Sequence, residues 1–277
     1  MIRARAQEQL RALLEHQEGT TAGRDPEELH RYRVAIRRLR SLLKGVPAVD
    51  PGGELRAELK WLGSLTSPVR DIDVLLIRLD REITVFALPD RRHATVLVRA
   101  LRAERGGHRR RLNRALASKR YADLLSGLST LAQSAPEEPE GPDVPPPSLH
   151  KPYRKLARAV ADLGDDPPDD RLHALRIRGK RLRYAAETAK PAADKARRRQ
   201  LAALVTACKK LQDTLGEHQD AVVAAAKIRE LAAAQDDVAV AFVAGRLAER
   251  EQARRAAART AWPTAWQRVS TAATAVL

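Results

Sequence analysis

Two stretches of the sequence decide its fold: LHRYRVAIRRLR at residues 29–40 and LHALRIRGKRLR at residues 172–183. They align without a gap at an offset of 143 residues, and six of the twelve positions are identical, including the histidine and three arginines. A second match follows each stretch at an offset of 149, where Lys60, Leu62 and Asp71 correspond to Lys209, Leu211 and Asp220. Two matches in the same order predict an internal duplication, with a small insertion in the loop between them.

Both stretches carry the apolar spacing of an amphipathic helix. Residues at steps of three and four fall on one side of a helix with about 3.6 residues per turn. Such steps select a continuous apolar stripe in the first stretch, and the second stretch repeats it with one glycine. We therefore expect two core stripes: Leu29, Tyr32, Ile36, Leu39 and Leu43 in the first copy, and Leu172, Leu175, Gly179, Leu182 and Ala186 in the second.

A cationic side chain directly follows most residues of each core stripe in the sequence, so the cations form a row beside the stripe. We call them the first row (His30, Arg33, Arg37, Arg40 and Lys44) and the second row (His173, Arg176, Lys180 and Arg183). Residues 29–44 and residues 171–183 each hold six Lys or Arg and no acid. Like charges at this spacing destabilise an isolated helix, whereas a merely solvated face usually mixes charges of both signs. A solvated face stays the alternative, but its repetition in one register favours two surfaces that bind a repeating anion.

The composition favours an all-α protein with a strong positive charge. Of the 277 residues 44% are hydrophobic and only 3% aromatic, and 51 Lys and Arg against 35 Asp and Glu give a net charge of +16. Such a field attracts polyanions of any kind. Cys208 is the single cysteine, so no internal disulfide can form, and we expect it to be a small core residue. The sequence has no signal-like segment and no run of about 18 apolar residues, so we expect a soluble, cytoplasmic protein without a membrane partner.

A proline-rich segment divides the chain near its middle. Residues 135–148, APEEPEGPDVPPPS, contain six of the sixteen prolines and four acids but no base. Proline cannot continue a helix and stiffens an extended chain, so we expect a linker between bundles at residues 1–134 and 149–277. Periodicity predicts helices at 2–18, 26–45, 53–66, 69–86, 90–117 and 119–133, and then at 150–163, 169–189, 192–215, 217–234, 236–260 and 262–275.

These motifs together give the sequence a resemblance to the CHAD family, the histidine-bearing α-helical domains. The resemblance rests on LHRYRVAIRRLRSLLK and LHALRIRGKRLRYAAE, is supported by LTSPVRDIDVLL, LQDTLGEHQDAVV and SKRYADLLSGL, and covers nearly the whole chain. It implies an all-α fold of two antiparallel helical bundles related by a pseudo-twofold axis, with a basic cavity between them. It also implies binding of inorganic polyphosphate and association with polyphosphate granules.

By position, the resemblance implies phosphate contacts from both stretches and from the helix that follows each. These residues are His30, Arg33, Arg37, Arg38, Arg40, Lys44 and Lys60 in the first copy, and His173, Arg176, Lys180, Arg181, Arg183, Lys209 and Lys210 in the second. The copies differ at two places. Glu187 stands where the first copy has Lys44, which weakens the far end of the second row. Gly179 replaces Ile36, which permits closer helix packing at a cost of about 1 kcal/mol in helix propensity.

Catalytic and metal-binding functions have weaker support than simple binding. No histidine is followed by aspartate, as a His-Asp phosphohydrolase would require, and the phosphate loop GxxxxGK[ST] is absent. Glu27 and Asp170 stand three residues before His30 and His173, a spacing also found in di-iron bundles. However, acids at a helix start offset the helix dipole, and the neighbouring cations repel a divalent metal. We therefore expect a non-enzymatic protein without a metal or cofactor.

Nucleic acid is the alternative ligand. Any basic helical protein binds DNA weakly through counterion release. The two rows contain no Asn or Gln that could distinguish bases, and the chain has few aromatic residues on which bases could stack. We therefore expect polyphosphate as the preferred partner and nucleic acid as a weak, non-specific one. The sequence leaves the oligomeric state open.

Overall fold

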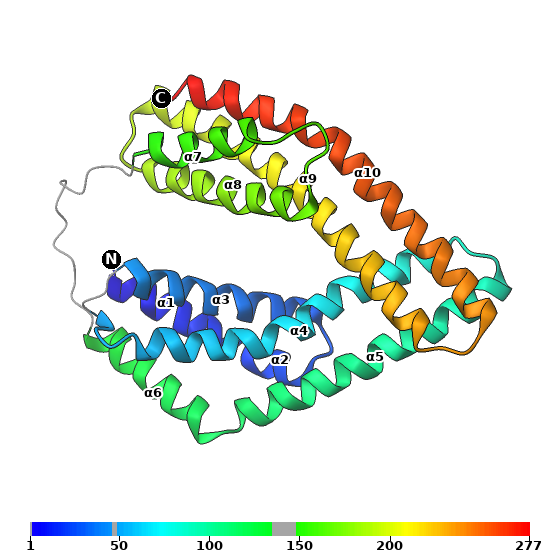
Figure 1. Cartoon of the computed structure of the whole chain (residues 1–277). Helices are drawn as coiled ribbons and strands as arrows, with labels where there is room; N and C mark the ends of the chain where they lie inside the picture. Colours follow the sequence, from blue (N-terminus) through cyan, green and yellow to red (C-terminus); the bar gives the residue numbers. More distant parts are fainter. Residues whose placement is uncertain (1, 46–48, 135–147) are drawn as a thin grey trace. The chain divides into compact units, whose positions relative to one another are not determined.

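The computed structural model describes residues 2–45, 49–134 and 148–277, and the chain divides into two compact units. Unit 1 covers Met1–Pro142 and unit 2 covers Asp143–Leu277, so the division falls inside the predicted linker. The linker prediction itself concerns residues 135–148, nearly all of which lie outside the described residues. Every regular element in the described ranges is an α-helix (Figure 1), which confirms the predicted all-α class. The internal duplication, the pseudo-twofold axis and the basic cavity between bundles stay predictions.

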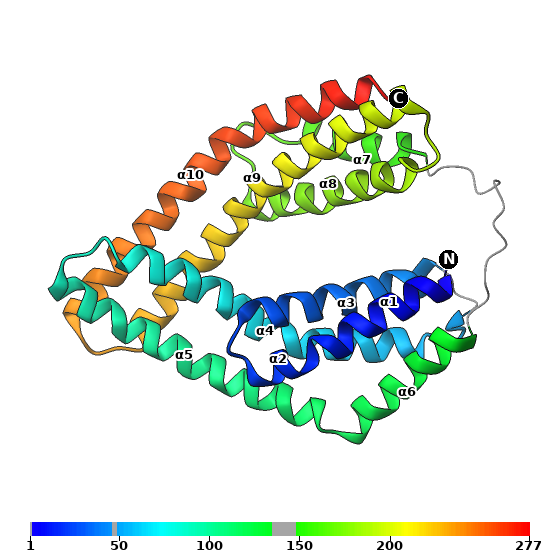
Figure 2. The same cartoon turned by 180° about the vertical axis from the view of Figure 1, so that it is seen from behind.

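Unit 1 is built from helices that surround a leucine-rich core. Its described helices are α1 (Ile2–Glu15), α2 (Gln17–Ala22), α3 (Pro26–Gly45), α4 (Glu54–Ile83), α5 (Leu88–Leu116) and α6 (Lys119–Ser134). Helix α3 packs against α1 and α4, and α4 continues along α5 (Figure 2). The first core stripe is buried as predicted, with every member at most 4% exposed. Within this core the hydroxyl of Tyr32 donates to that of Tyr121 at 3.0 Å, which ties α3 to α6.

Unit 2 repeats the helical architecture with fewer and longer helices. Its described helices are α7 (His150–Ala161), α8 (Asp169–Ala189), α9 (Lys195–Ala233) and α10 (Val238–Thr274). Helix α8 packs against α7 and α9, and α9 pairs with α10. All five residues of the second core stripe are buried. Cys208 is also fully buried, as predicted, and burial raises the pKa of its thiol to about 12. None of the helices within the described ranges is both long enough and apolar enough to span a membrane.

Three predicted helix ends are wrong, because α4, α9 and α10 continue through Pro68, Gly216 and Pro263. A proline inside a helix costs about 3 kcal/mol, because it lacks an N–H and crowds the preceding turn. Packing near Pro68 offsets that cost: Thr66, two residues before it, and Val69, one residue after it, are only 0% and 2% exposed. The predicted helix 2–18 is also wrong, since it is two helices, α1 and α2.

Candidate functional site

A groove of about 330 Å³ lies between α3 and α4 in unit 1. Three arginines of the first row line it, together with Lys60, three hydroxyl-bearing residues and a floor that includes one glycine. The complete lining is Arg33, Ile36, Arg37, Arg40, Lys60, Gly63, Ser64, Thr66 and Ser67. Four cations and three hydroxyls without a carboxylate form a set of groups suited to phosphate oxygens.

Arg33 is held in the groove by hydroxyl groups of α4. Its Nη1 donates to Ser67 Oγ at 2.8 Å and to Thr66 Oγ1 at 3.3 Å. Each hydroxyl in turn donates to the carbonyl of Gly63 at 3.0 Å, which fixes its orientation. Burial lowers the pKa of the Arg33 guanidinium, against the opposing charge of Asp71. The groove therefore contains a positioned and partly desolvated cation.

His30 lies one helical turn before Arg33 and is half-buried. Burial lowers the pKa of its imidazole, and the charge of Arg70 adds to that effect while Glu27 opposes it. Arg70 comes from α4, and its Nη1 donates to the carbonyl of Pro26 at 3.2 Å, at the start of α3. Burial and the charge of Arg70 thus favour the neutral imidazole.

Four polar residues of α4 were not predicted from the sequence: Ser64, Thr66 and Ser67, which line the groove, and Arg70, which bonds to the start of α3. A weak signal for them was present, since steps of four, three and three from Lys60 lead to Ser64, Ser67 and Arg70. The sequence alone does not show which side of α4 faces α3. Serine and threonine in a helix also tend to bond their own backbone, which hides a positioning role.

In unit 2, Arg176 of the second row lies against α9 at Gly216. A Cβ atom built on Gly216 would be 3.4 Å from Arg176 Nε, so the glycine permits this close approach. At the two offsets of the sequence alignment, Arg176 corresponds to Arg33 and Gly216 to Ser67. Each unit thus places an arginine of its row against the same aligned position of the next helix.

A second aligned contact exchanges a large and a small residue. In unit 1, a Cβ atom on Gly63 would lie 3.8 Å from Ile36 Cγ2. In unit 2 the aligned residues are Gln212 and Gly179, and a Cβ atom on Gly179 would lie 3.9 Å from Gln212 Cγ. The side chain that fills the space comes from α3 in one unit and from α9 in the other. This exchange explains why Gly179 departs from the apolar pattern.

Several nitrogen atoms of the two rows are buried without a hydrogen-bond partner among the described residues. They are Arg40 Nε in the first row and His173 Nδ1, Arg176 Nε and Arg183 Nε in the second. A buried polar atom without a partner costs about 1–3 kcal/mol, so each one calls for an explanation. Oxygen atoms of a bound anion would satisfy the arginine donors, and would also satisfy the imidazole when Nδ1 carries its proton.

The remaining predicted residues lie outside the groove. Arg38 is exposed on the side of α3 that faces α1, where its Nη1 donates to Gln9 Oε1 at 3.4 Å. Lys180 is half-buried in the second row. The other predicted cations are exposed and do not line the groove: Lys44, Arg181, Lys209 and Lys210. The structure therefore brings together Arg33, Arg37, Arg40 and Lys60, and it does not bring Arg38 to them.

Sequence comparisons identify relatives of this chain. The family model described as the CHAD domain matches residues 4–229. Two uncharacterized proteins, from two strains of Mycobacterium tuberculosis, are each 30% identical over 210 residues, which cover 71% of this chain and 39% of theirs. The chain thus spans about two fifths of the length of these curated relatives.

Solved structures share the fold. The crystal structure of the CHAD domain from the plant Ricinus communis is similar with a TM-score of 0.69 and 29% identity, over 95% of this chain and 89% of that one. PptA from Streptomyces chartreusis is similar with a TM-score of 0.70 and 24% identity, over 96% of each chain. At 24% identity the second likeness concerns the fold alone.

Proposed function

The chain belongs to the CHAD domain family, and from this premise we propose that it binds inorganic polyphosphate without catalysing a reaction. The observation that carries the proposal is the groove of unit 1, where Arg33, Arg37 and Arg40 meet Lys60 and three hydroxyl groups. The groups of one row repeat at each turn of the helix, about every 5.4 Å. A polymer with a negative charge on every unit can engage all of them at once, whereas a single phosphate can engage only one turn.

The buried, unpartnered nitrogen atoms give the proposal independent support. The folded protein tolerates the cost of leaving Arg40 Nε and Arg176 Nε without acceptors. A polyphosphate chain supplies acceptor oxygens along its entire length, so binding recovers that cost at several positions. In the cell, such binding would place the protein at polyphosphate granules in the cytoplasm.

Reversal of one groove charge tests this proposal. Arg37 is exposed and lines the groove, so Arg37→Glu removes a cation from the site with little effect on the core. Arg38→Glu is the matched control, because it makes the same change one residue away on the side that faces α1. We expect calorimetric titration with a short polyphosphate to show at least about tenfold weaker binding for Arg37→Glu, and less than about threefold for Arg38→Glu. Equal losses in the two variants would contradict the proposed site.

A further inference from the structure

Helix α5 carries a second cationic surface, on the side opposite its core contacts. Its buried side includes Leu97, Leu101 and Leu112. With 3.6 residues per turn, four arginines fall within about 60° of one another on the opposite side. We call them the α5 face: Arg92, Arg99, Arg110 and Arg114, all of which are exposed. The two acids of α5, Asp90 and Glu104, lie outside this sector.

Some arginines of α5 hold the fold together, and others make no such contact. On the inner side, Arg105 bonds to the buried carboxylate of Asp73, and Arg109 Nη2 donates to the carbonyls of Thr21 and Ala22 at 2.9 and 2.6 Å. These arginines hold α5 against α4 and against the end of α2. The four arginines of the α5 face, in contrast, make no ion pair or side-chain hydrogen bond with any residue that the structure describes. Packing therefore does not explain their presence.

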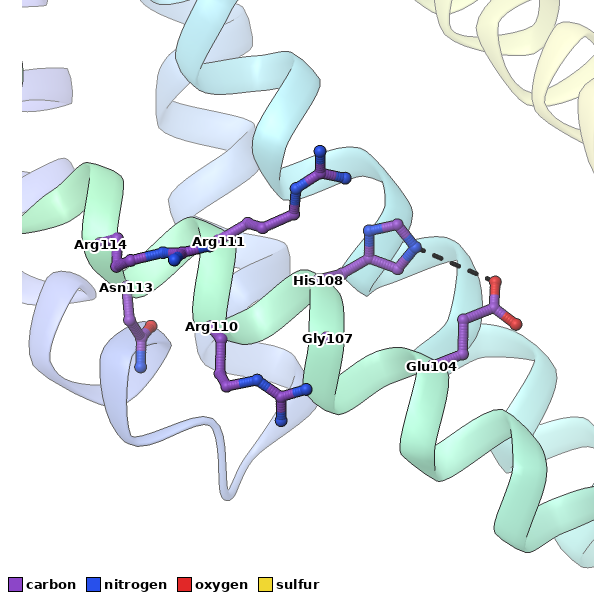
Figure 3. Close-up of a pocket in the computed structure, with 7 residues that line it drawn as sticks. All are labelled: Glu104, Gly107, His108, Arg110, Arg111, Asn113 and Arg114. Atoms are coloured by element: carbon purple, nitrogen blue, oxygen red, sulfur yellow. Dashed lines mark ion pairs between the residues drawn. The ribbon is translucent and has the colours of Figure 1, made fainter.

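The surface is hollowed at the C-terminal end of the α5 face. The hollow has a volume of about 680 Å³ and is lined by three arginines and also by Glu104, which lies 3.9 Å from His108; Figure 3 shows Arg110 and Arg111 extending from different sides of the helix. Gly106 and Gly107 precede these arginines, although glycine disfavours the interior of a helix. Apart from Arg110, no neighbouring side chain lies within 4 Å of a Cβ atom built on either glycine, so close packing does not require them. They leave the helix backbone open to a large ligand.

The spacing of the α5 face favours a stiff polyanion. From Arg92 to Arg114 the face extends about 33 Å, with gaps of about 10 Å, about 16 Å and about 6 Å between successive cations. A flexible polymer would lose conformational entropy in bridging such gaps. Duplex nucleic acid has a persistence length of about 500 Å, so it is already straight over this distance. An anionic membrane is a poorer match, because the one apolar side chain of the sector larger than alanine, Val96, is partly buried and offers little surface that could enter lipid.

We propose that the α5 face binds the phosphate backbone of duplex nucleic acid, independently of base sequence and apart from the groove between α3 and α4. The sector contains no Asn or Gln, and the amide of the adjacent Asn113 is engaged by the carbonyl of Thr21 at 3.2 Å. The face therefore offers no amide that could pair with adenine, and its arginines, although arginine can also pair with guanine, contact phosphate oxygens whatever the base sequence. In both Figure 1 and Figure 2, α5 runs along the edge of unit 1 away from α3, so a ligand in the groove leaves the α5 face open.

Three neutral substitutions on the full chain test the proposal. The face variant is Arg99→Gln, Arg110→Gln and Arg114→Gln. The control variant has the same loss of charge on exposed residues of α7: Arg154→Gln, Lys155→Gln and Arg158→Gln. With a labelled duplex of about 30 base pairs, we expect anisotropy to show at least tenfold weaker binding for the face variant, and a log–log salt slope smaller by about 2.7. Equal losses in both variants would show that net charge alone binds the duplex, and would overturn the proposal.

A second comparison separates this proposal from polyphosphate binding in the groove. We expect the face variant to bind a short polyphosphate within about twofold of the unmodified chain, and Arg37→Glu to bind the duplex within about threefold. If the face variant loses polyphosphate and duplex affinity together, the α5 face serves the phosphate polymer and the proposal is wrong. If the unmodified chain binds the duplex but not polyphosphate, the proposed function fails while this one stands. Circular dichroism melting of each variant confirms that it is folded.

Discussion

The first and second rows have the same sequence pattern but hold their central arginine differently. Arg33 donates to two hydroxyl groups of α4, at 2.8 and 3.3 Å. Arg176, at the aligned position, lies over Gly216 and leaves its Nε without a partner. Arg33 is thus held in place by its own unit, whereas Nε of Arg176 has no acceptor among the described residues. Two copies of one sequence pattern thus hold the aligned arginine in different surroundings.

The two rows also differ in charge at their far ends. Lys44 ends the first row, whereas Glu187 stands at the aligned position and lies 3.7 Å from Arg183. At the offset of the second match, Asp213 corresponds to Ser64, which lines the groove of unit 1. Both differences make the surroundings of the second row less positive. We infer that unit 1 contributes more to the affinity for a polyanion than unit 2 does.

The starts of the two row-bearing helices are anchored by different interactions. In unit 1, Arg70 donates to the neutral carbonyl of Pro26 at 3.2 Å. In unit 2, the carboxylate of Asp169 accepts hydrogen bonds from Arg255 at 2.8 Å and Arg259 at 3.1 Å, and it lies 3.0 Å from Nε2 of the buried His218. An ionic anchor contributes more to stability than a bond to a neutral carbonyl, but it also depends on pH.

The largest expected effect concerns this ionic anchor. Asp169→Ala leaves His218 without its partner and removes a carboxylate from two arginines, so we expect a loss of about 2–3 kcal/mol in the free energy of unfolding. Burial alone would raise the pKa of Asp169, but Arg255, His218 and Arg259 outweigh it and hold the pKa below the ordinary value. The contribution is therefore present above that ordinary value and is lost as the pH falls through the lowered pKa.

Denaturant unfolding near neutral pH and in acid measures the effect. The control is Asp166→Ala, which removes an exposed carboxylate that also pairs with Arg259. We expect the control to change stability by less than about 1 kcal/mol. A similar loss in both variants would mean that the buried end of the cluster has no special role.

The next effect concerns the hydroxyl groups that position Arg33. We expect Ser67→Ala to weaken polyphosphate binding by about fivefold, roughly 1 kcal/mol, because Arg33 loses its shorter hydrogen bond. Calorimetry of Ser67→Ala, Arg33→Gln and the double variant measures the coupling between the two residues. If Ser67 acts through Arg33, the double variant binds no more weakly than Arg33→Gln alone. Additive losses would show that Ser67 acts separately from Arg33.

A smaller effect should follow from the charge difference at the ends of the rows. We expect Lys44→Glu to weaken polyphosphate binding by about threefold and Glu187→Lys to strengthen it by a similar factor, because both residues are exposed and screened by salt. Glu249→Lys on α10 makes the same charge change away from the rows and should alter affinity by less than about 1.5-fold. Titration at two salt concentrations measures all three, and an equal gain from Glu249→Lys would refute the assignment.

The smallest expected effect is the pH dependence that arises from His30. Burial, together with Arg70, lowers the pKa of His30 below its ordinary value of 6.5, so the imidazole of the free protein is neutral at pH 7. Its protonation therefore opposes folding as the pH falls below 6.5. A bound polyanion reverses the field and raises the pKa, so binding takes up a proton and tightens by about two- to threefold on acidification. Calorimetry in buffers of different ionisation enthalpy should detect this uptake in the unmodified chain and not in His30→Gln. Unchanged uptake in the variant would assign it to another group.

Local patterns predicted much of the fold, including the bounds of both row-bearing helices. The predicted ranges 26–45 and 169–189 coincide with α3 and α8. Pro26 and Gly45 mark the ends of the first, and Pro168 precedes the second. The core stripes and the neighbouring rows follow from helical geometry alone, because residues at steps of three and four share a side wherever the helix packs.

The sequence by itself thus determined the helical class, the two stripes and the cations beside them, since each depends on residues close together in the chain. Tertiary structure decided which cations meet in one place. Helix α4 brings Lys60, Thr66 and Ser67 to the first row, while Arg38, which is on α3 like that row, lies on the side toward α1. Tertiary packing also lets α4 continue through Pro68, because the burial of neighbouring residues before and after the proline outweighs its local cost. These outcomes depend on contacts between segments that are distant in the sequence. The free energies of such contacts cannot be read from a local sequence pattern.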